Sequence, residues 1–231
     1  MNLPRASGIL LHPTSFPGPD GIGDLGPEAY QWIDFLKDSG TTLWQVLPLG
    51  PAGYGDSPYQ CFSAFAGNTY LISPTLLLDQ GLLTRADFTD RPVFPAEGVD
   101  YGNAIQWKLT LLNRAFTRFT TRQDDELQNR FNQFCKENTA WLQDYAIFMA
   151  IKESQGGRSW LDWEKTLKMH EPAAVQQFTE KNVQAIQEQQ FRQFLFFEQW
   201  NALREYAHTN GVKIIGDVPI FVSMDSADVW A

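Results

Sequence analysis

Near the N-terminus, two short apolar runs flank a helix-forming segment, which is the pattern of a strand–helix–strand unit. Residues 7–11 and 42–47 are apolar and short enough to be buried strands. Between them, Pro27 suits the first position of a helix and Gly40 suits the residue after its end. Four apolar residues recur at helical spacing: Ala29, Trp32, Ile33 and Leu36. The two runs begin about thirty residues apart, the length of one crossover unit, so we expect two parallel strands.

The strand pattern returns only at residues 212–217, after a long segment with helical periodicity. Residues 48–69 resemble a loop, and helices are expected over 105–122, 126–136, 139–153, 161–169 and 172–208. A closed (β/α)₈ barrel needs eight strands and typically about 250 residues. We therefore expect an α/β chain that forms the first part of such a barrel, with three strands present and a large, mainly helical insertion between the second and third.

Composition and charge exclude several classes of protein. The 18 Lys and Arg against 27 Asp and Glu give a net charge of −9, which argues against binding to nucleic acid phosphates. No apolar stretch of about 18 residues suggests a membrane span, and no secretory signal is visible, so a cytoplasmic location is expected. Cys61 and Cys135 lack the spacing of a disulfide framework or a zinc site. The three histidines form neither a triad nor a metal cluster and are expected to be structural.

Three long motifs are similar to those of one enzyme family. They are SGILLHPTSFPGPDGIGDLG (7–26), WQVLPLGPAGYGDSPYQCFSAFAGN (44–68) and IIGDVPIFVSMDSADVW (214–230). The chain resembles, from end to end, the 4-α-glucanotransferases called amylomaltases or disproportionating enzymes. The resemblance implies a (β/α)₈ barrel of the α-amylase clan with inserted helical subdomains, and neither a cofactor nor a metal.

The same resemblance implies an activity and a division of the chain. The family cleaves an α-1,4 linkage of a maltooligosaccharide and transfers the glycosyl unit to the 4-hydroxyl of another glucan, with retention. Residues 1–69 would hold strands 1 and 2 and an active-site loop. Residues 70–211 would form a mainly helical inserted subdomain, and residues 212–231 the third strand and the start of a truncated helix.

The resemblance implies that the carboxylates that catalyse the reaction in this family lie outside this chain. A retaining transfer needs two carboxyl groups about 5–5.5 Å apart. Only Asp217 follows a predicted barrel strand, at the end where barrel active sites are built. The family's nucleophile, acid/base and stabilising carboxylates lie on later strands. We therefore expect no catalytic residue in this chain and no activity from it alone.

The resemblance does imply five sugar-binding residues. Asp217 would bind sugar hydroxyls, although an aspartate before a bend can equally cap a turn. Tyr59 would lie beside the glucan, with Ser57 as a nearby contact, although Tyr59 could instead pack the loop onto the barrel. Tyr54 and Tyr101 match a second glucan site of some family members, although loop tyrosines on a surface often bind nothing specific.

Two further classes of function stay open on the sequence alone. The chain could be a glucan-binding module without catalysis, or an inert fragment whose unpaired strand edges favour aggregation. In the leading interpretation its partners are maltooligosaccharides and α-1,4-glucans. The sequence does not determine its oligomeric state.

Overall fold

The computed structural model describes residues 5–53, 55 and 57–231, which divide into two compact units. The first unit comprises the described residues up to 49 together with 68–122 and 195–218. The second comprises the described part of 50–67 together with 123–194 and 219–231. Each unit is therefore assembled from segments far apart in the sequence.

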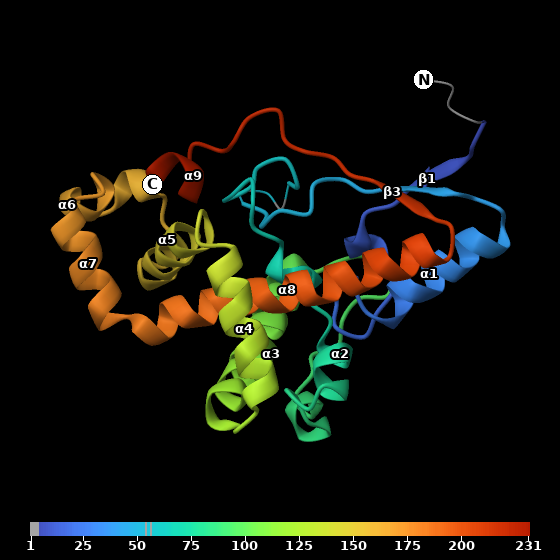
Figure 1. The fold of residues 1–231 in the computed structure, drawn as a ribbon, viewed down its shortest axis with the longest axis horizontal. Coiled ribbons are helices and arrows are strands. Elements are labelled where there is room, and N and C mark those ends of the chain that lie inside the picture. The colour runs from blue at the N-terminus through green and yellow to red at the C-terminus, as the bar shows by residue number, and fades with distance from the viewer. Residues whose placement is uncertain (1–4, 54, 56) are drawn as a thin grey trace. The chain divides into compact units, whose positions relative to one another are not determined.

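The first unit contains a parallel three-stranded sheet in the order β1-β2-β3 (Figure 1). The strands are β1 (Gly8–Leu10), β2 (Leu43–Gln45) and β3 (Lys213–Ile215). The sequence prediction of parallel strands is confirmed, although each strand is shorter than its apolar run. Gly8 pairs with Leu43, and a Cβ added at Gly8 would lie 2.8 Å from the Leu43 Cβ, so this close approach requires glycine.

Helix α1 (Pro27–Asp38) and the C-terminal part of α8 (Val183–Thr209) lie side by side in the first unit. Tyr206 donates a hydrogen bond of 2.6 Å to Asp34, and the Tyr206 ring lies 5.0 Å from that of Tyr30. The helix begins at a proline and is followed by Gly40 at φ +72°, as the sequence predicts. Its buried residues are Ala29, Ile33 and Leu36.

The first unit also contains α2 (Pro74–Asp79), the 3₁₀ helices Pro13–Ser15, Thr69–Leu71 and Arg85–Phe88, and the long α3 (Tyr101–Thr121). Helix α3 begins four residues earlier than predicted because Asp100 caps it, accepting a hydrogen bond from the Asn103 backbone at 3.2 Å. Its buried side chains include Trp107, Leu111 and Phe116.

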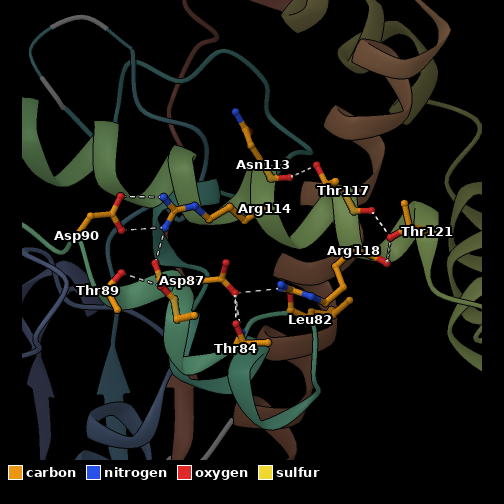
Figure 2. Close-up of polar contacts among 11 residues, drawn as sticks. Leu82, Thr84, Asp87, Thr89, Asp90, Asn113, Arg114, Thr117, Arg118 and Thr121 are labelled. Atoms are coloured by element: carbon orange, nitrogen blue, oxygen red, sulfur yellow. Dashed lines mark hydrogen bonds and ion pairs between the residues drawn. The ribbon is translucent and has the colours of Figure 1, made fainter.

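Charged and polar contacts fix residues 82–90 to α3 (Figure 2). Arg114 forms a bidentate pair with Asp90, with distances of 3.0 and 2.8 Å. Arg118 donates to Leu82 O at 2.8 Å and to Asp87 at 3.1 Å. The Asp87 carboxylate also accepts from the Thr84 backbone N–H at 2.7 Å and from its hydroxyl at 2.8 Å. One carboxylate thus closes a capping box and pairs with a helix arginine.

This arrangement predicts acid sensitivity that depends on Asp87. Burial alone would raise the pKa of Asp87, but hydrogen bonds from Thr84 and the charge of Arg118 outweigh it, so the pKa lies below 3.8. A carboxyl group with a lowered folded-state pKa stabilises the protein above its unfolded pKa of about 4, and that contribution is lost as the pH falls through the folded value. Asp87→Asn should therefore flatten the decline in stability below about pH 4.

Urea unfolding between pH 2.5 and 7 measures this effect. Asp79→Asn is the control, because Asp79 is an acidic residue at the end of α2. If Asp87→Asn and the parent chain lose stability equally between pH 4 and 2.5, the assigned role of Asp87 is wrong.

The second unit is mainly helical and packs around aromatic side chains. Its helices are α4 (Asp125–Glu137), α5 (Leu142–Ser154), the 3₁₀ helix Trp160–Asp162, α6 (Lys165–Lys168), α7 (Pro172–Lys181), the N-terminal part of α8 and α9 (Ala227–Trp230). Phe148, Trp163 and Trp230 form the centre of the core, with ring centroids 5.4 to 5.9 Å apart. Residues 145–152 of α5 are all buried or half-buried, so neighbours cover the middle of this helix on all sides, which fits its apolar sequence there.

Two helix predictions are wrong in detail. The single helix expected over 172–208 is broken at Asn182, which ends α7 and precedes α8. The Asn182 side chain donates to the Phe178 carbonyl at 2.8 Å, a local bond that competes with the continuing helix. The helix expected over 161–169 is two short pieces separated by the buried Trp163. None of the helices in the described residues has the length and apolarity needed to cross a bilayer.

Candidate functional site

In the first unit, the candidate site residue nearest the sheet is Asp217, two residues beyond β3. It lies at the carboxyl end of the parallel strands, the edge at which α/β sheets bind ligands. The side chain is half-buried, and its Oδ1 accepts a hydrogen bond of 2.9 Å from the Val218 backbone. This bond reaches only the next residue, whereas a turn-capping aspartate bonds the backbone N–H two residues on, which Pro219 lacks. The bond therefore holds the carboxylate at the strand end without forming the expected turn cap.

His12 follows β1 at the same edge and caps a short helix. Its Nδ1 lies 2.7 Å from the Thr14 hydroxyl oxygen, and it caps the 3₁₀ helix Pro13–Ser15. Burial lowers the pKa of His12 below 6.5, and a hydrogen bond to the Pro48 backbone offsets this only in part. The imidazole is therefore neutral at pH 7, and the structural role expected from the sequence stays a prediction.

In the second unit, residues 50–67 form a hairpin-like loop that presents Ser57 and Tyr59. Ala52 and Cys61 form an antiparallel bridge, flanked by hydrogen bonds from Gly53 N to Gln60 O at 2.8 Å and from Phe62 N to Pro51 O at 3.0 Å. The Tyr59 side chain is 45% exposed, near the tip. Residues 51–53 and 60–62 thus pair with one another, and Tyr59 between them is partly exposed to solvent.

The last residues of this loop are anchored by two side chains from distant segments. Asp228 of α9 accepts from the Ser63 hydroxyl at 3.1 Å and from Ala64 N at 2.6 Å. Gln193 of α8, which is fully buried, accepts from Gly67 N at 2.7 Å and donates to Gly67 O at 3.0 Å. The loop that carries Tyr59 is therefore held by contacts about 126 and 165 residues away in the sequence.

Sequence reasoning missed Asp228 and Gln193. Asp228 lies within the motif DSADVW, which is one of the segments that resemble the family, but the sequence predicted only the start of a helix there. That start is confirmed by α9, whose Ala227 N also donates to Phe62 O at 2.8 Å. Nothing in the local sequence of α8 distinguishes Gln193 from its neighbouring glutamines.

The five predicted sugar-binding residues are distributed over both units. Ser57 and Tyr59 lie in the second unit, whereas Asp217 and Tyr101, the half-buried first residue of α3, lie in the first. Tyr54 lies outside the described residues. Their meeting in one site stays a prediction.

The cysteines have the properties of unreactive thiols. Burial, with a smaller effect of the Asp228 charge, raises the pKa of Cys61, and burial raises the pKa of Cys135 to about 11. Both thiols are free, and both are protonated at neutral pH. Within the part of the chain that the structure describes, no cluster of three or more His, Cys, Asp or Glu side chains is placed to hold a metal ion.

These features define an α/β protein in which Asp217 follows the third parallel strand and in which a mainly helical second unit carries an aromatic loop. Residues 11–231 match the sequence family described as 4-alpha-glucanotransferase, and the chain belongs to that family.

Individual relatives agree with this assignment. The chain is 48% identical over 231 residues to a 4-alpha-glucanotransferase of Thermus thermophilus, covering 100% of this chain and 45% of that protein. It is 46% identical over 227 residues to that of Synechocystis sp., covering 98% and 45%. Among solved structures it is similar to the amylomaltase from Streptococcus agalactiae in complex with acarbose, with a TM-score of 0.91 and 38% identity, covering 99% of this chain and 46% of that one. The chain thus spans less than half the length of these relatives.

Proposed function

We propose that this chain contributes part of the glucan-binding surface of a 4-α-glucanotransferase, an enzyme that transfers a segment of an α-1,4-glucan to the 4-hydroxyl of an acceptor glucan or glucose. The observation that carries the proposal is the family match over residues 11–231, together with Asp217 beyond the end of β3 and the partly exposed Tyr59. A similar amylomaltase was solved with acarbose bound. The substrates would be maltooligosaccharides and α-1,4-glucans, met in the cytoplasm and without a cofactor.

The proposed architecture is the first part of a (β/α)₈ barrel. Three adjacent parallel strands in chain order are what the start of such a barrel contains. The mainly helical segment 70–211 would be the insertion between strands 2 and 3, preceded by residues 1–69 and followed by 212–231. In this proposal further strands would pair with β1 and β3, the edges of the sheet, where Leu10 and Ile215 are exposed.

The proposed chemistry is a retaining transfer whose reacting carboxylates lie outside these 231 residues. The mechanism needs two carboxyl groups about 5–5.5 Å apart, one as nucleophile and one as acid/base. Of the two described residues that directly follow each strand, only Asp217 carries a carboxyl group. The chain alone would therefore bind glucan without transferring it, which is also what a glucan-binding module would do.

Disproportionation of maltotriose tests this proposal. The 231-residue chain is compared with a chimera that joins it to the part of the Thermus thermophilus relative that it does not span. The expected result is glucose and longer maltooligosaccharides from the chimera and none from the chain alone. An inactive but folded chimera would contradict the transferase proposal, and activity of the chain alone would contradict the assignment of the carboxylates.

In the active chimera, Tyr59→Ala should weaken the use of maltotriose more than it weakens stability. Removing an aromatic contact should lower kcat/KM roughly two- to tenfold. The melting temperature should change little, because the ring is 45% exposed and buries limited apolar area. Tyr59→Phe is the matched control, since it keeps the ring and removes only the hydroxyl. An unchanged kcat/KM with a lowered melting temperature would assign Tyr59 to loop packing instead.

A further inference from the structure

The loop that carries Tyr59 presents a second exposed aromatic ring, that of Phe65. Phe65 is 59% exposed, and its ring stacks on that of Trp141, with centroids 6.4 Å apart and planes inclined by 20°. Trp141 is itself fixed, because its indole N–H donates to the Asn138 side chain at 3.1 Å and its ring contacts Tyr145 at 6.1 Å. Phe65 and Trp141 therefore form an aromatic surface in which the Trp141 ring is fixed by contacts within the second unit.

The backbone beneath Phe65 is held by side-chain hydrogen bonds. The Ser63 hydroxyl accepts from Phe65 N at 3.1 Å and from Ala66 N at 3.4 Å, and the same hydroxyl donates to Asp228. Asp228 also accepts from Ala64 N at 2.6 Å. A large apolar ring thus stands in solvent on a backbone that is already ordered, so little conformational entropy would be lost when a ligand covers the ring.

We propose that Phe65, supported by Trp141, is a platform for α-glucan in addition to the five residues expected from the sequence. The inference rests on the proposed function, because it takes the glucan from there. The face of an aromatic ring carries partial negative charge and attracts the C–H groups of a sugar face. Phe65 lies six residues from Tyr59 on the same loop, so the platform belongs to the segment that is already expected to contact glucan.

The chain offers a matched control pair in the first unit. Phe35 is 55% exposed and stacks on Trp32, with centroids 5.5 Å apart and planes inclined by 23°. This pair lies within helix α1, away in sequence from the loop that presents Tyr59. If exposure and stacking alone were enough for a phenylalanine to bind glucan, substitution of Phe35 and of Phe65 would weaken the binding equally.

Affinity electrophoresis of the 231-residue chain in gels containing amylopectin tests the platform without requiring activity. The parent chain should be retarded, and Phe65→Ala should weaken the binding roughly two- to tenfold. Phe65→Trp should retain binding, Phe65→Leu should lose it while keeping apolar bulk, and Phe35→Ala should leave it unchanged. Circular dichroism confirms that each variant is folded.

Any of three results would overturn the platform. The first is no retardation of the parent chain by amylopectin, and the second is equal retardation of the parent and Phe65→Leu. The third is retardation of the parent chain by hydroxyethylcellulose equal to that by amylopectin. Failure of the platform is distinguishable from failure of the proposed function. If the chimera transfers glucan but Phe65→Leu binds amylopectin as the parent does, the platform fails and the transferase proposal stands. If the chimera is inactive but binding of amylopectin depends on Phe65, the result supports a binding module instead.

Discussion

Replacing Lys152 with methionine should lower the free energy of unfolding by about 3 kcal/mol. Lys152 lies on α5 with only 5% of its surface exposed. Its ammonium nitrogen lies 2.6 Å from Asp225 Oδ2, 3.2 Å from Arg158 O and 4.7 Å from the Phe62 ring centroid. Methionine has a similar length but no charge, so Asp225 would lose its partner in a partly buried position. Removing one member of a buried pair is costly because the remaining charge is left uncompensated.

Urea unfolding measures the total loss of stability, and amide hydrogen exchange locates it. Faster exchange is expected in the second unit, which contains both α5 and Asp225. Lys165→Met on the exposed surface of α6 is the matched control and should cost less than about 0.5 kcal/mol. Adding Asp225→Asn to Lys152→Met should recover part of the loss. A cost below about 1 kcal/mol for Lys152→Met would show that the pair contributes little.

Replacing Gln193 with leucine should cost about 2–6 kcal/mol, because two buried backbone groups would lose their partners. The Gln193 amide bonds to both N and O of Gly67, in the manner of a neighbouring strand. Leucine has a similar size but neither donor nor acceptor. Leaving a buried donor or acceptor unpaired costs about 1–3 kcal/mol for each group.

The local consequence should be release of the loop that presents Tyr59. Amide exchange at residues 63–67 should accelerate by more than the global loss of stability requires. Gln190→Leu is the matched control on the same helix, because Gln190 donates to the exposed side chain of Gln143 and not to backbone groups of the loop. Equal costs for the two variants would mean that the bonds to Gly67 add nothing to an ordinary helix position.

The strands and most helices could be predicted from sequence because their signals are local. The apolar runs of β1 and β2 end at His12-Pro13 and Pro48, and α1 is bounded by Pro27 and Gly40. The break at Asn182 was missed because one asparagine is tolerated in many helices, and here its side-chain bond to Phe178 O decides the outcome.

The candidate site was only partly predictable, because sequence patterns report local structure and not contacts between distant segments. The exposed ring of Tyr59 was expected, since Pro58 restricts the loop on which it lies. The anchors of that loop, Asp228 and Gln193, act through partners more than 120 residues away, and no local pattern records such a pairing. The same holds for Gln199, which bonds to both backbone groups of Ser73 in the first unit.

The anchoring of loop 50–67 by Asp228 also sets the order in which this surface can mature during synthesis. Ser63 leaves the ribosome 165 residues before the carboxylate that holds it. At roughly 5–20 residues per second, the loop exists without this anchor for about 8–33 s. During that interval Phe65 and Tyr59 lie on a segment that lacks this support. The motif DSADVW (225–230) therefore completes the anchoring of the aromatic loop long after the loop itself and its other anchor, Gln193, have been synthesised.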